Sequence, residues 1–284
     1  MKLMTFSYGN EVKIGLVRGK GIIDIAKRLE VSSLKQLIAD DNFTEVLKYI
    51  NEKPDYQLDE IEFLPVIPNP THIFCIGTNY ADHLQEAIDA GLPRSKTDHP
   101  PLFLRFADTL VGHDQPLLKS PQVSKLDYEC ELAVIIGKPG RYIAEDKALN
   151  HVAGYSCFNE ASARDWQFHT TQITPGKNFF GTGGFGPWMV TADEIPDPQN
   201  LQIKTHLNNV TMQDANTKDM IFNVAEIISY VSNLIELQSG DVIASGTPSG
   251  VGFSRDPQIF MNAGDVCEIE IEQIGTLRNV ISQG

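Results

Sequence analysis

Two glutamates stand two residues apart at the start of an apolar stretch, DYECELAVIIGK, residues 127–138. Alternate side chains of a β-strand share a face, so Glu129 and Glu131 would project together. Two ionised carboxylates side by side repel each other and need a compensating cation. A hard divalent ion with oxygen ligands would supply that charge. The alternative is a pair of ordinary glutamates on an exposed edge, and the pattern alone leaves it open.

A third carboxylate follows about thirty residues later, in FNEASARDWQ. Glu160 comes directly after the apolar strand pattern VAGYSCF, and Arg164 and Asp165 follow at the spacing of a short helix. A carboxylate at the change from strand to helix can reach a metal ion, or can simply lie near the positive end of the helix. This segment alone is compatible with both interpretations.

His83 and Glu86 are candidates for proton transfer. They lie three residues apart in NYADHLQEAIDAG, so on a helix they would be neighbours on one face. A carboxylate beside an imidazole can fix its tautomer and so prepare it to activate water. An exposed helical contact is the alternative. Lys177 lies among glycines that let the backbone approach a ligand, although a lone lysine is often a solvated surface charge.

Residues 181–186 match G-x-G-x-x-G, but the neighbouring sequence argues against a dinucleotide site. That fingerprint needs a strand before it and a helix after it. Here a polar loop precedes the glycines, and Pro187 with the following WMV predicts a strand. The later loop SGTPSGVG lacks the G-K-[ST] ending of a phosphate loop, and the sequence has no G-x-S-x-G serine nucleophile motif.

The elements that must position these residues are mostly strands. Residues 1–65 predict a small N-terminal α+β domain, with two strands joined by the turn YGNE and helices in VSSLKQLIAD and TEVLKYINE, each with Ser or Thr near its start. The proline-rich FLPVIPNPTH predicts a linker. Residues 66–284 show many strand patterns and one longer amphipathic helix in NVAEIISYVSNLIEL. We therefore expect a mixed α/β, β-rich fold without a doubly wound sheet.

The bulk composition restricts the partners. The 284 residues include 37 acidic and 23 basic ones, and the net charge of −14 argues against nucleic acid and anionic membranes as partners. Four scattered cysteines form no CxxC pair, which favours buried, reduced thiols. We find no signal-peptide pattern and no apolar run of the roughly 18 residues that a membrane span needs. A cytoplasmic location is expected.

The order of the motifs is more specific than any one of them. NYADH precedes E-x-E-L, which is followed by N-[acidic]-x-S-A-R-D-x-Q, by G-K-N-F ahead of G-P-W, and by S-G-T-P-x-G-V-G. In this order, over about residues 70–275, they resemble the fumarylacetoacetate hydrolase family. The resemblance implies a β-roll catalytic domain, here residues 66–284, and a homodimer. Many members also carry a small N-terminal domain of this kind.

The resemblance further implies a metal centre. Family members bind Mg²⁺ or Mn²⁺ through the E-x-E pair, here Glu129 and Glu131, and through the acidic residue before S-A-R-D, here Glu160. Most members have Asp at that last position, and a subset has Glu. A small anionic 2-oxo acid could chelate the ion through its carboxylate and keto oxygens. The ion would then stabilise the negative charge that develops when the substrate reacts.

Other positions acquire roles through the same resemblance. Lys177 matches a lysine that contacts substrate oxygens. His83 and Glu86 match the pair that activates water in hydrolytic members, on a helix that orders when substrate binds. The remaining matches are expected to contact substrate or line its pocket: Arg105, Gln167 and Thr247.

The leading functional hypothesis is a metal-dependent hydrolase that cleaves a C–C bond in a 2,4-dioxo acid of the acylpyruvate type. His83 and Glu86 favour this reaction. The alternative is a 2-oxo-acid decarboxylase, or an isomerase of hydroxymuconate-type diacids, toward which Glu160 points. A metal-binding protein without catalysis is disfavoured, because a metal store needs neither Lys177 nor His83.

Overall fold

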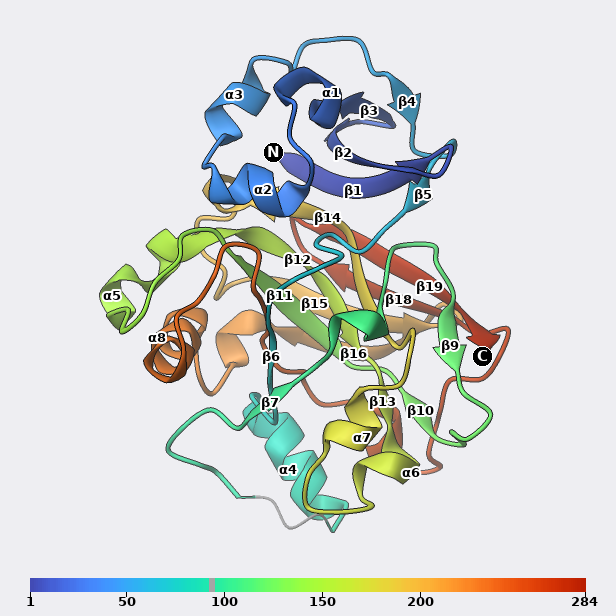
Figure 1. Ribbon diagram of the computed structural model, residues 1–284. Coiled ribbons are helices and arrows are strands. Elements are labelled where there is room, and N and C mark those ends of the chain that lie inside the picture. The colour runs from blue at the N-terminus through green and yellow to red at the C-terminus, as the bar shows by residue number, and fades with distance from the viewer. Residues whose placement is uncertain (92–94) are drawn as a thin grey trace.

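The computed structural model describes residues 1–91 and 95–284, and a large mixed β-sheet runs through it (Figure 1). Ten of its strands lie side by side in this order: β4 (Tyr56–Gln57), β3 (Gly21–Asp24), β2 (Glu11–Arg18), β1 (Lys2–Tyr8), β14 (Gly183–Thr191), β12 (Val152–Glu160), β11 (Cys130–Ile136), β17 (Val242–Ala244), β6 (Ile73–Ile76) and β7 (Leu102–Leu104). Strand β5 (Glu62–Phe63) pairs with β1, and β8 (Leu110–Val111) pairs with β14. Every residue of β11 and β12 is buried.

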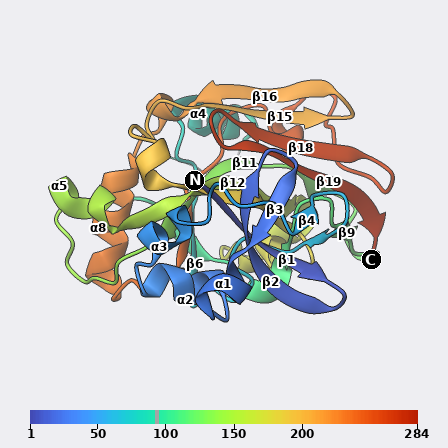
Figure 2. The same ribbon diagram turned by 90° about the horizontal axis from the view of Figure 1, so that it is seen from above.

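A second, five-stranded sheet packs against β11 and β12 of the large sheet. Its strands are β16 (Val210–Asn216), β15 (Gln202–Leu207), β18 (Val266–Ile271), β19 (Gly275–Gln283) and β9 (Leu117–Lys119). Seen from above, this sheet lies on one side of β11 and β12, and the N-terminal helices lie on the other (Figure 2). Two short strands, β10 (Leu126–Asp127) and β13 (Ser162–Ala163), pair beside the ends of β11 and β12.

Alternate side chains of β11 pack into two different hydrophobic clusters. Leu132 and Val134 join the cluster that contains the apolar residues of β15, β18 and β19, while Ala133 and Ile135 join the cluster beneath the N-terminal segment. Successive side chains of a strand point to opposite faces, so this division follows from the sequence CELAVII. Glu131 has the parity of Ala133 and Ile135.

The N-terminal segment contains the expected hairpin and helices. Strands β1 and β2 meet at Gly9 and Asn10, both with positive φ, as the turn YGNE predicts. The helices are α1 (Ile25–Leu29), α2 (Leu34–Ala39) and α3 (Phe43–Leu47). Ser33 caps α2, but α3 begins after Asn42, so Thr44, the threonine near the start of TEVLKYINE, lies inside the helix and does not cap it. Strand β1 also pairs with β14, so one sheet crosses the predicted boundary at residue 65.

Short helices surround one end of β11 and β6. These are α4 (Ala81–Asp89), α6 (Arg164–Gln167) and α7 (Thr174–Lys177), and Figure 1 shows them together at the bottom of the molecule. The two other helices are α5 (Glu145–Ala148) and α8 (Val224–Leu234). Helix α8 is the amphipathic helix expected from NVAEIISYVSNLIEL, and Asn223 and Glu226 form a capping box at its start.

Several features of the expected fold are confirmed. The fold is β-rich and mixed α/β, and β14 occupies the place where a dinucleotide fingerprint would need a helix. The four cysteines are free and buried, as their apolar surroundings predict. In the predicted linker, residues 63–72, Phe63 belongs to β5 and residues 64–72 form neither helix nor strand, although Val66 and Ile67 are buried. Within the described residues, no helix is long and apolar enough to cross a membrane.

Candidate metal centre

Three glutamates meet where β11 and β12 lie side by side. The strands are antiparallel and pair Glu131 with Phe158, and the amide of Glu160 donates to the carbonyl of Glu129 at 3.0 Å. The register therefore brings the last residue of β12 next to the E-x-E pair. One oxygen of each carboxylate lies within 4.8 Å of the others, and all three side chains are buried.

The burial of three carboxylates in one place demands positive charge. Burial and the charges of Glu160 and Glu129 raise the pKa of Glu131 well above its usual value. Burial also outweighs the neighbouring cations and raises the pKa of Glu160. Burial opposes ionisation of Glu129 too, but there Lys177 and Arg164 prevail and lower the pKa to about 2.

Lys177 shows that a cation fits between these carboxylates. It lies at the end of α7, where its ammonium donates to Glu129 Oε2 at 2.8 Å and also to Glu160 Oε2. Burial lowers the pKa of Lys177, but Glu129 and Glu160 more than compensate and raise it. Three carboxylates around a positive charge form the hard oxygen donor set that suits Mg²⁺ or Mn²⁺. The residues present thus fit the divalent ion that the family resemblance implies.

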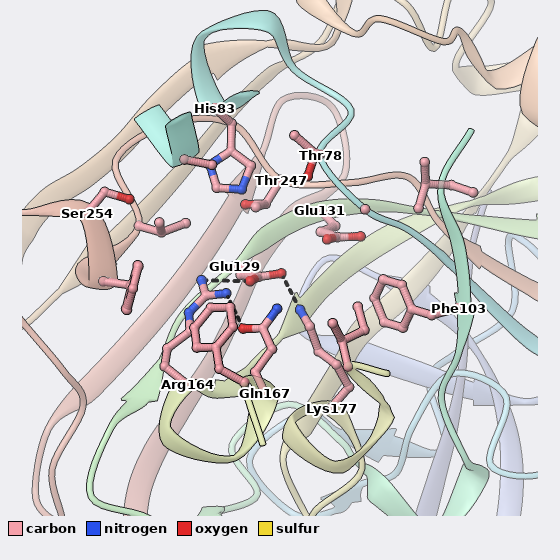
Figure 3. A pocket seen from close by; sticks show the side chains of 17 residues that line it. Thr78, His83, Phe103, Glu129, Glu131, Arg164, Gln167, Lys177, Thr247 and Ser254 are labelled. Carbon is pink, nitrogen blue, oxygen red and sulfur yellow. Dashed lines mark hydrogen bonds and ion pairs between the residues drawn. The ribbon is translucent and has the colours of Figure 1, made fainter. Parts of the chain in front are cut away.

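His83 and Glu86 form the expected pair on α4. The carboxylate of Glu86 uses Oε2 to contact His83 Nδ1 at 2.9 Å and uses Oε1 to accept from the amide of Gly250 at 2.9 Å. Glu86 thereby ties the helix to the loop after β17 and orients the imidazole. Figure 3 shows the His83 ring on one side of Glu129 and Glu131, with Lys177 on the other.

Gln167 and Thr247 line the same small cavity, as expected. Gln167 Oε1 accepts from Arg164 Nη1 at 2.9 Å, and Thr247 Oγ1 accepts from Gln213 at 2.9 Å. The cavity measures about 50 Å³, which is room for a few water molecules. The polar residues that line it are Thr78, His83, Glu129, Glu131, Arg164, Gln167, Lys177, Thr247 and Ser254. Its walls are otherwise apolar, with Ile76, Phe103, Ile173 and Phe253 among them.

Arg105 does not line this cavity. Its buried guanidinium binds Glu160 Oε1 through Nε at 2.9 Å and through Nη2 at 2.7 Å. Nη2 also donates to the carbonyl of Ala161, and Nη1 donates to Thr182. Each of the three guanidinium nitrogens thus donates inside the protein, and the expected direct substrate contact lacks geometric support.

Arg164 lines the cavity too, although its spacing from other residues predicted only a short helix. Its Nε donates to the buried Asp127 at 2.8 Å, and its Nη2 lies 2.7 Å from Glu129 Oε1. That Nη2 makes an ion pair without hydrogen-bond geometry and has no hydrogen-bond partner among the described residues. A buried, unsatisfied N–H at a cavity is available to a ligand oxygen. The S-A-R-D motif marked the position, but the pairing with Asp127 cannot be read from spacing.

Comparison with known proteins identifies the class. The family model for the C-terminal domain of fumarylacetoacetate (FAA) hydrolase matches residues 72–282. The chain belongs to the fumarylacetoacetate hydrolase family, whose fold the structure confirms. The relatives reported below are enzymes of this family.

Two relatives and one solved structure are informative. Oxaloacetate tautomerase YisK of Bacillus subtilis is 37% identical over 99% of this chain and 100% of its own length. A mitochondrial oxaloacetate tautomerase of Bos taurus is 39% identical over 78% of this chain and 70% of its own. Maleylpyruvate hydrolase from Sphingobium sp. SYK-6, solved with manganese(II) and pyruvate, is 27% identical with a TM-score of 0.83, and all of both chains is covered.

Proposed function

We propose that this protein is a divalent-metal-dependent enzyme that interconverts the keto and enol forms of a small 2-oxo diacid of the oxaloacetate type. The support comes from the three buried glutamates, from the proton-transfer pair beside them, and from similarity to oxaloacetate tautomerases. Glu129, Glu131 and Glu160 would hold Mg²⁺ or Mn²⁺. The similar maleylpyruvate hydrolase structure, which contains manganese and pyruvate, supports this ion and this substrate class.

The reaction moves one proton. In the keto-to-enol direction, a C–H bond at C3 breaks, its electrons form the C2–C3 double bond, and the C2 oxygen gains a proton. A bound divalent ion would act as a Lewis acid that stabilises negative charge on the C2 oxygen. The protein must therefore supply a base close to C3 and hold the 2-oxo diacid substrate in place.

His83 is the proposed base. Glu86 binds its Nδ1, so Nε2 is the nitrogen left for proton exchange with C3. Lys177 contributes positive charge beside Glu129 and Glu160, on the other side of the cavity. Arg164, with its unsatisfied Nη2, and Gln167 would bind a carboxylate of the substrate. The Asp127 carboxylate keeps Arg164 in this orientation.

The observation that carries the proposal is the opposed placement of His83 and Lys177. A proton acceptor on one side and a cation on the other flank Glu129 and Glu131, which line a cavity of about 50 Å³. Proton transfer to and from carbon needs this arrangement but no attacking water molecule.

The direct test is to follow enol oxaloacetate by ultraviolet absorbance after it is added to the protein with Mn²⁺. We expect the protein to accelerate conversion to the keto form far beyond the rate with Mn²⁺ alone. Proton–deuterium exchange at C3, followed by NMR, should accelerate as well. An unchanged rate in both assays would refute the tautomerase proposal.

Hydrolysis of an acylpyruvate is the second candidate, and the His83–Glu86 pair specifically favours it. The same imidazole could activate water for attack on a second carbonyl, with loss of a 2-oxo-acid enolate. The two reactions are distinguished by their products, because only hydrolysis releases pyruvate and a second acid. Release of CO₂ from oxaloacetate would instead support a decarboxylase. Isomerisation of a hydroxymuconate-type diacid would support an isomerase.

A homodimer and a cytoplasmic location remain predictions. The exposed side chains of Phe106 and Phe180, 57% and 72% exposed, offer apolar surface that a second copy would cover. The chain segments that carry them meet, because the amide of Phe106 donates to Asn178 Oδ1 at 2.7 Å. Sedimentation equilibrium should give twice the chain mass of 31.5 kDa, and a clean monomer mass would contradict the dimer.

A further inference from the structure

Arg105 and Glu160 form a buried clamp beside the proposed metal position. Both side chains are fully shielded from solvent. The clamp occupies only one oxygen of the carboxylate, Oε1, which accepts from both Nε and Nη2 of Arg105. The other oxygen, Oε2, accepts from the ammonium of Lys177, which also donates to Glu129. The two oxygens of Glu160 therefore have different partners and different surroundings.

Neighbouring residues hold the arginine rigidly. Thr182 and the carbonyl of Ala161 accept from Nη1 and Nη2 at 3.1 and 2.8 Å. Gly183 provides the space, because a Cβ at that position would lie 3.2 Å from both Cδ and Nη1 of Arg105. This glycine belongs to the segment that matches G-x-G-x-x-G and begins strand β14. Its lack of a side chain lets the guanidinium reach the carboxylate.

The length of Glu160 makes the arrangement possible. Its extra methylene, relative to aspartate, lets one carboxylate contact Arg105 and still present Oε2 to the centre. An aspartate at this position would withdraw the carboxylate by about 1.5 Å, one C–C bond. Contacts of 2.7 and 2.9 Å to Arg105 would then exceed hydrogen-bond length.

We propose that Arg105 is a positioning residue that makes Glu160 a one-oxygen ligand and thereby selects a small six-coordinate ion over Ca²⁺. The inference rests on the metal centre of the proposed function. Ca²⁺ takes six to eight oxygens and accepts carboxylates through both of theirs, whereas Mg²⁺ requires near-octahedral geometry. With Oε1 committed to Arg105, Glu160 cannot offer the second oxygen. Groups that orient metal ligands typically change metal affinity by about 10- to 100-fold when they are mutated.

The test measures ion affinity in the absence of substrate. Five EDTA-stripped proteins are titrated with Mn²⁺, Mg²⁺ and Ca²⁺ by calorimetry. They are the wild type, Arg105→Met, Arg105→Lys, Glu160→Asp and the double variant Arg105→Met/Glu160→Asp. Arg28→Met is the matched control, since Arg28 forms ion pairs with Glu52 and Asp55 in the N-terminal segment. Circular dichroism melting verifies that each variant is folded. Arg105→Lys retains the charge and keeps the test available if Arg105→Met does not fold.

The proposal predicts that Arg105→Met lowers the affinity for Mg²⁺ and Mn²⁺ about tenfold or more and lowers the affinity for Ca²⁺ less. The ratio of Ca²⁺ affinity to Mg²⁺ affinity should therefore rise about tenfold. Arg105→Lys should give a smaller shift in the same direction. In the Glu160→Asp background the arginine no longer reaches the carboxylate, so its removal should change the ratio less than twofold.

Three results would overturn the inference. The first is an unchanged ratio in Arg105→Met, the second is an equal loss for all three ions, and the third is the same shift in the Glu160→Asp background. If the wild type binds Mn²⁺ and any of these occurs, only the role of Arg105 fails. If the wild type binds no Mn²⁺, the proposed metal centre fails together with it.

Discussion

Two regions face each other across the cavity, and they are built differently. The carboxylate floor, formed by Glu129, Glu131 and Glu160, comes from two paired strands in which every residue is buried. The helix wall is α4, which carries His83 and Glu86 and has one buried residue, Ala87. The floor is fixed by strand register. The wall is tied to the opposite loop through the hydrogen bond from Gly250 to Glu86.

The difference separates two tasks. Binding of a metal ion needs ligands that cannot move, because the position of the ion depends on every oxygen around it. Proton transfer and substrate entry tolerate a less buried element, and such elements open locally at low free-energy cost. We therefore expect changes in the floor to abolish metal binding, and changes in the wall to slow turnover while metal binding persists.

The largest expected effect comes from Glu131→Gln in the floor. The amide keeps the shape but removes a negative ligand, so Mn²⁺ affinity should fall by more than about a hundredfold, beyond the usual effect of an outer partner. The metal-free variant should be at least as stable as wild type, because burial and the charges of Glu160 and Glu129 disfavour the Glu131 charge. Calorimetric titration and thermal melting measure both quantities. Unchanged Mn²⁺ affinity would remove Glu131 from the metal centre.

The next effect is expected from His83→Ala in the wall. Loss of a general base typically costs about 10²–10⁴ in rate, so turnover of enol oxaloacetate should fall within that range. Mn²⁺ affinity should stay within about twofold of wild type, because His83 lies outside the group of three glutamates. Gln85→Ala, an exposed change on the same helix, is the control. Normal turnover in His83→Ala would place the base elsewhere.

Glu86→Gln should have a smaller effect. The amide still accepts from the Gly250 amide, but it replaces a charged partner of His83 by a neutral one. A hydrogen bond with a charged group contributes about 1.5–3 kcal/mol, which corresponds to a loss of roughly tenfold or more in kcat. Steady-state kinetics separates kcat from KM. A loss as large as that of His83→Ala would show that Glu86 itself takes part in proton transfer.

The smallest effect is expected outside both regions, at the start of α2. Ser33 accepts from the amide of Gln36, and Leu34 and Leu37 pack in the same core cluster as Ala133 and Ile135 of β11. Ser33→Ala should lower the free energy of unfolding by about 1 kcal/mol and leave Mn²⁺ affinity and turnover unchanged. Urea denaturation measures the first quantity. A parallel loss of Mn²⁺ affinity would mean that the floor depends on overall stability and not on its own ligands.

The sequence indicated which residues could share the candidate site better than it indicated the hydrogen bonds and ion pairs among them. The spacing of Glu129 and Glu131 and the strand pattern around them predicted a shared face, since strand geometry has a strict period of two. His83 and Glu86 followed from helical spacing in the same way. The pairings Arg105–Glu160 and Arg164–Asp127 span 55 and 37 residues and depend on how the strands and loops pack together. No local pattern encodes such contacts.

The fold shows the same division. Turn chemistry predicted the β1–β2 hairpin, and helical periodicity predicted α8. The pairing of β1 with β14 joins residues almost two hundred positions apart and was not anticipated from sequence. Strand order depends on long-range contacts, which periodicity does not report.

Metal dependence is the central claim, and one titration tests it most directly. EDTA-stripped protein is supplied with increasing Mn²⁺, bound ion is counted by electron paramagnetic resonance, and the rate of enol oxaloacetate conversion is measured in the same samples. We predict negligible rate enhancement without metal, and a rate that rises in proportion to bound Mn²⁺ until one ion is bound per chain. Full activity in the stripped protein, or activity that does not depend on bound Mn²⁺, would contradict the account.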